Sequence, residues 1–306
     1  MVGVLHGFAV ILGIIGAGYL AARFGIVRGD QRRVLNNMSF YVALPALLFG
    51  VLQRSDPAIV VSPVILVTTL AAVLVAALYV LVSRLWFRGD LASTTLGATS
   101  SGYVNSNNLG LPVAIYILGD AAYVAPLILI QVVVYAPVIL TILEKTRGNA
   151  TGAAFALGRA ASNPVIIASA LGFGFALLGI EAPEIVMGPI DMLGAASVPM
   201  VLLSFGISLR GQRPLSPGGN RRAVLVASGI KLLVMPLLAW ALCVLAQLEP
   251  HETFVATTIA ALPTAQNVYN YAATYRRAEL QVRDTVFITT FASLPVIAVV
   301  AWTLGA

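Results

Sequence analysis

The sequence predicts an all-α membrane protein with ten transmembrane helices, arranged as two inverted five-helix repeats with broken crossover helices 4 and 9. Three observations lead to this fold class. The 306 residues are 59% hydrophobic and 10% charged, whereas a soluble chain has about 25% charged residues. The chain divides into ten apolar runs of roughly the 20 residues that a spanning helix needs. Glycine and proline motifs of the first half also recur, in order, in the second half.

The ten apolar runs are separated by charged segments or by segments rich in proline and glycine. They cover residues 3–23, 34–52, 62–83, 91–119, 121–144, 163–180, 186–209, 223–247, 253–275 and 283–304. The first run lacks the basic segment that precedes the apolar part of a signal peptide, so we expect it to be a helix. We expect the formal charge of +6 to set the orientation in a lipid bilayer, with no nucleic acid as partner.

Basic residues collect in the loops that follow odd-numbered helices. Only Arg54, in an even-numbered loop, and Lys231, within the eighth helix, depart from this pattern. The other basic residues are Arg23, Arg28, Arg32, Arg33, Arg84, Arg88, Lys145, Arg147, Arg159, Arg210, Arg213, Arg221, Arg222, Arg276, Arg277 and Arg283. We expect the protein to lie in the inner (plasma) membrane. Because basic loops tend to stay in the cytoplasm, we expect both termini outside the cytoplasm.

The internal repeat rests on four motif pairs. Gly16–Tyr19 matches Gly172–Phe175 at an offset of 156, Pro45 matches Pro199 at 154, Pro112 matches Pro263 at 151, and Pro137 matches Pro295 at 158. Five helices per unit would insert the second unit upside down, so we expect two units, residues 1–150 and 151–306. Inverted repeats are a transporter architecture with a substrate site near the midplane.

Two of the apolar runs contain polar inserts. Residues 99–112 include three asparagines, two glycines and Pro112, and residues 262–271 include Pro263, Gln266 and two asparagines. We expect both helices to break there, because proline and glycine weaken a helix. Each second half-helix would then begin at the midplane, where its N-terminus favours an anion. The alternative is that these side chains only form hydrogen bonds between helices.

Few other polar residues fall at membrane depth. Lys231 lies about 13 Å from the cytoplasmic end of its helix at 1.5 Å per residue, and it either extends towards the cytoplasm or helps to neutralise an anion. Asp191 is expected near the outer surface, too far away to pair with Lys231. Gln131 either donates to a substrate carboxylate or bonds to a neighbouring helix, and Glu144 is expected to be solvated.

Several motifs together are similar to those of one transporter family. Asn105, Gly110 and Pro112 are similar to the broken helix of PIN-type carriers, and Gln131, Tyr135 and Glu144 match a second binding-site helix. Ala261-Leu262-Pro263 matches the start of the second crossover, and Phe287 to Pro295 resembles the last helix. The chain thus resembles the auxin efflux carrier family, which includes bacterial malonate and malate permeases and plant PIN-type carriers.

The resemblance implies which residue contacts the substrate, which helices form a scaffold and which helices move. An asparagine seven residues before the proline contacts the substrate carboxylate in PIN-type carriers, which implies that role for Asn105. Helices 1, 2, 6 and 7 would form a scaffold, helices 3–5 and 8–10 a moving unit, and the protein a homodimer. The expected substrate-binding residues are Asn105, Asn108, Gly110, Pro112, Gln131, Lys231, Pro263, Thr264, Gln266 and Asn267.

Two positions depart from the PIN-type pattern. Leu48 replaces a serine near the substrate, and Val268 replaces a second proline in the helix-9 break. These departures count against auxin itself, and we expect a small organic anion, a mono- or dicarboxylate that is auxin-like or malonate- or malate-like. We expect a secondary transporter that works by alternating access, with no enzymatic reaction, cofactor or metal.

Two other functions remain open at this stage. The first is a sodium-coupled carrier of the bile-acid type, whose cation sites would favour carboxylates near the crossover. Neither break contains Asp or Glu, although backbone and amide oxygens could still hold Na⁺. The second is a membrane enzyme, but the sequence has no His-Glu-x-x-His motif and no intramembrane carboxylate pair.

Overall fold

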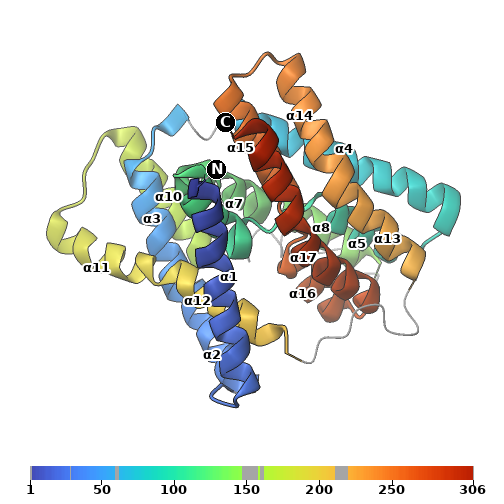
Figure 1. Ribbon diagram of the computed structural model, residues 1–306, viewed down its shortest axis with the longest axis horizontal. Coiled ribbons are helices and arrows are strands. Elements are labelled where there is room, and N and C mark those ends of the chain that lie inside the picture. Colours follow the sequence, from blue (N-terminus) through green and yellow to red (C-terminus); the bar gives the residue numbers. More distant parts are fainter. Residues whose placement is uncertain are drawn as a thin grey trace.

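The computed structural model describes residues 2–27, 29–58, 62–146, 158, 162–210 and 220–305. The regular elements in these ranges are helices (Figure 1). Seven helical segments are long and apolar enough to cross a membrane. The prediction of an all-α membrane protein is therefore confirmed.

The seven long segments include several that are built from consecutive helices. They are α1 (Val2–Arg23); α2 (Gly29–Met38) with η1 (Ser39–Ala43) and α3 (Leu44–Arg54); α4 (Pro63–Val82) with η3 (Ser83–Phe87); η6 (Ala121–Tyr123) with α7 (Ala125–Ile130), η7 (Gln131–Tyr135) and α8 (Ala136–Lys145); α11 (Glu184–Ala195) with α12 (Ser197–Ser208); α13 (Arg221–Gly229) with η8 (Ile230–Val234) and α14 (Met235–Leu245); and α17 (Glu279–Leu304).

Three predicted runs are helical without reaching the length of the other seven. The run 163–180 forms α10 (Pro164–Leu178), which has 15 residues. The run 91–119 divides into α5 (Leu91–Gly102) and a second part made of η4 (Ser106–Gly110), α6 (Leu111–Val113) and η5 (Ala114–Leu118). The run 253–275 divides into α15 (Pro250–Ala261) and α16 (Gln266–Tyr275). Both predicted helix breaks are thus present.

Two close helix contacts relate the halves of the chain. Gly18 of α1 lies against the backbone of Leu203 in α12, and Gly172 of α10 lies against the backbone of Phe49 in α3. A Cβ atom at either glycine would collide with that backbone, so only glycine permits these approaches. Adding 154 to Gly18 and Phe49 gives Gly172 and Leu203, so the glycine of each contact corresponds to the glycine of the other, and the two backbone partners correspond as well. The offset of 156 predicted for this glycine motif differs from this value by two residues.

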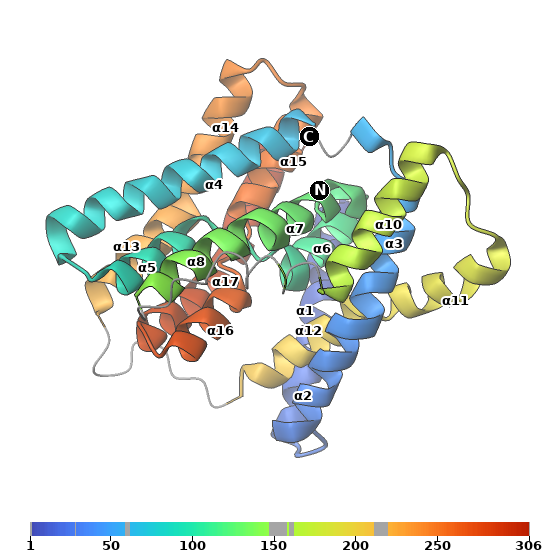
Figure 2. The same cartoon turned by 180° about the vertical axis from the view of Figure 1, so that it is seen from behind.

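Two groups of helices lie on either side of the molecule. Figures 1 and 2 show α1, α2, α3, α10, α11 and α12 on one side and α4, α5, α13, α14, α15, α16 and α17 on the other. The start of α1 and the end of α17 lie away from the turn that joins α1 to α2 (Figure 1).

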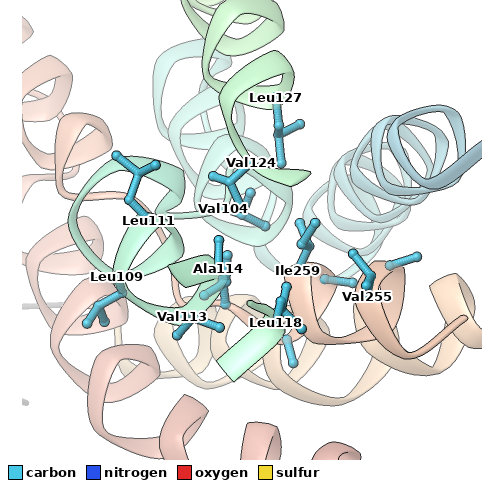
Figure 3. Packing of buried hydrophobic residues seen from close by; sticks show 14 of the residues in the cluster. Val104, Leu109, Leu111, Val113, Ala114, Leu118, Val124, Leu127, Val255 and Ile259 are labelled. Atoms are coloured by element: carbon cyan, nitrogen blue, oxygen red, sulfur yellow. The ribbon is translucent and has the colours of Figure 1, made fainter. Parts of the chain in front are cut away.

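A buried apolar cluster fixes the second part of the first broken helix in place. Ala114 and Leu118 from this part lie toward Ile259 and Val255 of α15, and Leu109 and Leu111 belong to the same cluster (Figure 3). Val124 and Leu127 belong to the same cluster, and each of these side chains is less than a tenth exposed. Because lipid tails are as apolar as these side chains, close van der Waals packing is what favours this contact in a membrane. The cluster therefore holds one broken helix against the other.

Candidate functional site

The two helix breaks meet and pair with each other. Asn105 donates its backbone N–H to the Pro263 carbonyl at 2.8 Å, and Ala265 donates its N–H to the Tyr103 carbonyl at 3.0 Å. These bonds form an isolated antiparallel bridge between Val104 and Thr264. Irregular backbone at membrane depth requires internal partners for its polar groups. Each break supplies those partners for the other, and we call this pairing the crossing.

Asn105 controls how the first broken helix restarts. Its side-chain Oδ1 accepts the backbone N–H of Asn108 at 3.0 Å, which makes it the N-cap of the second part. Its own carbonyl accepts the N–H of Gly110 at 2.8 Å. A Cβ atom at Gly110 would lie 3.1 Å from that carbonyl oxygen, so glycine allows the tight return of the chain. The Nδ2 group of Asn105 is the part left to donate to a ligand.

Pro112 and Pro263 do not occupy equivalent places. Pro112 lies in the first turn of α6, inside the helix that follows the break. Pro263 lies in the second break itself, where its carbonyl joins the crossing. The predicted match between these two prolines is therefore wrong in register. Val104 and Thr264 are the residues that face each other in the bridge. The bridge therefore marks the centre of each break, and the prolines do not.

Thr264 is fully buried and anchors the second break. Its hydroxyl donates to the Ser100 carbonyl at 2.6 Å, and its backbone N–H donates to the Thr289 hydroxyl at 3.1 Å. The first bond satisfies a carbonyl in the last turn of α5, which has no partner within its own helix. Thr264 therefore ties α5, α17 and the second break together, which is a structural role.

Gln131 also bonds within the protein. Its Nε2 donates to the Val104 carbonyl at 2.9 Å, while its backbone carbonyl lies 3.4 Å from the Tyr103 hydroxyl. The Gln131 residue is only 4% exposed. The sequence left two roles open for Gln131, donation to a substrate carboxylate or a hydrogen bond to a neighbouring segment. In this conformation Gln131 makes the second of these interactions.

Three predicted residues lie at the start of α16 or face it. Asn108 donates its Nδ2 to the Gln266 Oε1 at 3.3 Å, and Asn267 lies beside the Tyr103 hydroxyl. All three amides are partly exposed. Ala265 precedes α16 and provides no side-chain cap. The Val268 N–H donates to the Ala265 carbonyl at 3.2 Å, so the N–H groups of Gln266 and Asn267 are the ones available to a ligand. This end of α16 is therefore suited to bind an anion.

Lys231 is completely buried in η8. Its Nζ donates to the Ala260 carbonyl at 2.7 Å and lies 3.0 Å from the Met235 sulfur. Of the two roles left open for Lys231, extension towards the cytoplasm is therefore wrong. Ala260 belongs to the last turn of α15, where the carbonyl groups carry partial negative charge. The Lys231 side chain donates to that carbonyl directly beside the crossing.

Asp191 and Glu144, the two acidic residues considered in the sequence, both interact with other side chains. Asp191 forms an ion pair with Arg54 at 2.6 Å, and both side chains are exposed. It does not pair with Lys231, as expected. Glu144 was expected to be solvated, but it accepts a hydrogen bond from the Tyr275 hydroxyl at 2.5 Å and links α8 to α16. The α16 helix brings Tyr275 within reach, which the sequence spacing of these residues did not indicate.

A polar cavity of about 260 Å³ lies next to the start of α16. Its wall combines two arginines, amides, hydroxyls and aromatic rings from α2, α12, α16 and α17. The lining residues are Arg32, Phe205, Ser208, Leu209, Gln266, Tyr269, Asn270, Arg283, Val286, Phe287, Thr290 and Phe291. Gln266 is the one predicted site residue among them. Hydrogen-bond donors within partly apolar walls are typical of a small-molecule site.

Sequence reasoning did not select Arg32 or Arg283 as site residues. Both were interpreted as loop cations that set membrane orientation. Arg283 pairs with Asp284 at 2.8 Å, and the Asp284 side chain is only 2% exposed. The adjacent pair Arg283-Asp284, an acid next to a basic residue near the start of the last apolar run, was the sequence signal that could have indicated a site there.

Helix ends and cations make the crossing favourable for an anion. Two helical segments begin there, at Ser106 and Gln266, and two end there, at Gly102 and Ala261. The two N-termini carry partial positive charge and the two C-termini partial negative charge. Lys231 donates to a carbonyl at one of the two C-terminal ends, which leaves the two N-termini as the groups of the crossing that attract an anion.

Comparison with known proteins defines the class. The chain matches the family model described as membrane transport protein over residues 4–152 and 150–301. It is a multi-pass membrane transporter and belongs to this family, the auxin efflux carrier family. The resemblance deduced from the crossover motifs is confirmed.

Two relatives align over nearly their whole length. A Rhizobium meliloti protein named "Putative malonate transporter" is 29% identical over 92% of this chain and 90% of its own length. An uncharacterized transporter from Methanocaldococcus jannaschii is 26% identical over 96% of this chain and 97% of its own. The family and these relatives are transporters.

Proposed function

We propose that this protein is a secondary transporter of small organic anions, either mono- or dicarboxylates. The substrate would bind at the crossing and reach each side of the membrane by alternating access. The observation that carries this proposal is the uncapped start of α16 beside a polar cavity with two arginines. Malonate is the first substrate to test, because the Rhizobium meliloti relative carries it in its name.

The proposed architecture is ten membrane spans in two inverted repeats. The exchanged glycine contacts support it, since one offset of 154 residues relates both members of each pair. The α1, α2, α3, α10, α11 and α12 helices would form the scaffold, and the remaining helices would move. We further propose a homodimer in the inner membrane with both termini outside the cytoplasm. The distribution of basic residues supports this orientation of the termini.

The proposed substrate contacts fall into two groups. Asn105, Asn108, Gln266 and Asn267 would donate amide hydrogens to the anion. Lys231 would contribute positive potential through α15 without direct contact. The other predicted residues would shape the crossing, and these are Gly110, Pro112, Gln131, Pro263 and Thr264.

A transport assay with the purified protein tests this function. Proteoliposomes loaded with buffer are supplied with labelled malonate, malate, lactate, indole-3-acetate or taurocholate, each with and without Na⁺. We expect saturable uptake of a small carboxylate and a raised melting temperature in its presence, since a ligand that binds the native state stabilises it. Uptake of taurocholate that requires Na⁺ would favour the bile-acid type of carrier instead. Absence of uptake and of stabilisation for every carboxylate would refute the proposal.

A further inference from the structure

The cavity beside α16 is lined by two kinds of group that attract anions. Gln266 begins α16, a helix without a side-chain cap. Asn270, one turn further along α16, also lines the cavity, about 6 Å away at 1.5 Å per residue. Arg32 of α2 and Arg283 of α17 contribute guanidinium groups. A single carboxylate requires only one of these two kinds of group.

The two arginines differ in their partners. Arg283 donates from both Nε and a terminal nitrogen to the Asp284 carboxylate, at 3.0 and 2.8 Å. Its charge is therefore largely balanced within the protein. Arg32 is partly buried, and it forms no ion pair with any residue that the structure describes. Arg32 thus supplies the unbalanced positive charge of the cavity.

A partly buried guanidinium group facing a polar cavity has a definite ligand preference. Arginine presents a planar set of donors that matches the two oxygens of a carboxylate. Removing it from bulk water strengthens that interaction. Ser208 and Thr290 lie in the same wall and offer further hydroxyl donors. The aromatic rings of the wall can cover the short apolar part of a ligand.

We propose that Arg32 selects dicarboxylates over monocarboxylates. One carboxylate lies at the start of α16, as in the proposed function on which this inference rests, and the second is held by Arg32 across the cavity. Arg32 belongs to α2, whereas Gln266 belongs to α16, so the ligand joins the two groups of helices. A monocarboxylate would occupy the α16 end alone and leave Arg32 without a ligand.

The test compares two neighbouring arginines. Arg32→Gln removes the cation that lines the cavity, and Arg33→Gln is the matched control because Arg33 is exposed and lies outside the lining. Malonate and acetate binding to the full chain in lipid nanodiscs are measured by calorimetry. We expect Arg32→Gln to weaken malonate binding by about tenfold or more, the usual effect of losing a hydrogen bond to a charged group. Acetate binding and the Arg33→Gln variant should change less than about twofold.

The outcomes separate this inference from the proposed function. Equal losses for malonate and acetate in Arg32→Gln, or equal behaviour of the two variants, would overturn the inference while leaving carboxylate transport intact. Wild-type protein that binds acetate but not malonate would also overturn it. Wild-type protein that binds neither, and no other carboxylate, would refute both. If Arg32→Gln does not fold, Arg32→Lys replaces it, with a selective loss of malonate affinity expected because the two-pronged geometry is gone.

Discussion

Asn105 joins two tasks that substitution can separate. Its Oδ1 caps the second part of the broken helix through Asn108, and its Nδ2 is proposed to donate to the substrate. Asn105→Asp preserves the cap, because Asp and Asn are about equally good at this position. It replaces the amide donor with a negative charge. Asn105→Ala removes both functions.

The expected magnitudes follow from these bonds. Losing a cap costs about 0.5–2 kcal/mol of stability, so Asn105→Ala should melt at a lower temperature for that reason. Asn105→Asp keeps the cap, and any fall in its melting temperature would come from burial of its carboxylate. Losing a hydrogen bond to a charged ligand costs about 1.5–3 kcal/mol, which is roughly a 10- to 150-fold loss of affinity. Since Asn105 is only 3% exposed, little water competes for this bond. Asn105→Asp should lose at least as much affinity, because its charge repels the carboxylate.

Malonate uptake into proteoliposomes and thermal melting of the same samples measure the two effects. Asn107→Ala is the matched control, because the Asn107 Oδ1 is buried without a hydrogen-bond partner among the described residues. We expect its uptake to fall less than that of either Asn105 variant. Normal uptake by Asn105→Asp would refute the substrate contact. Loss of uptake only in Asn107→Ala would show that the assigned register of the crossover is wrong.

Three further predictions concern charge and orientation. Lys231→Met should bind malonate more weakly, and it should fold at least as well as the wild type because it removes a buried polar group along with its bond to Ala260. Unchanged malonate affinity in calorimetry would exclude a functional role for the Lys231 side chain. The bonds from Ser93 hold the pKa of Asp90 below its ordinary value, so the N-cap's stabilisation is present above about pH 4 and is lost as the pH falls through the lowered pKa. Asp90→Ala should therefore melt below wild type at pH 7, by a difference that shrinks in acid; a pH-independent difference would contradict this. A periplasm-active reporter fused to the C-terminus should be active, and inactivity would contradict the proposed orientation.

The sequence predicted the helices well because hydropathy reports burial in lipid directly. It also located both breaks, since proline and glycine weaken a helix wherever they stand and asparagines at membrane depth need polar partners. It did not predict that Val104 and Thr264 face each other. That pairing depends on the shape of two irregular segments, and the nearby prolines gave a different register.

Individual site residues were harder to predict than the breaks. Gln131 and Thr264 are polar and centrally placed, yet both satisfy backbone groups of the protein. Arg32 was overlooked because a cation near a helix end is usually interpreted as a topology signal. Its place in the cavity depends on how α2 packs near α12, α16 and α17, which local sequence does not encode.

The pairing of the two breaks also has a consequence for biogenesis. The Asn105 N–H and Tyr103 carbonyl find their partners in residues 263 and 265, about 160 residues later in the chain. At a synthesis rate of about 5–20 residues per second, the first break waits roughly 8–30 s for them. During that time its backbone groups need water, lipid headgroups or the insertion machinery as temporary partners, because hydrocarbon offers none. The first half of the chain therefore cannot complete its folding in the membrane before the second half has been made.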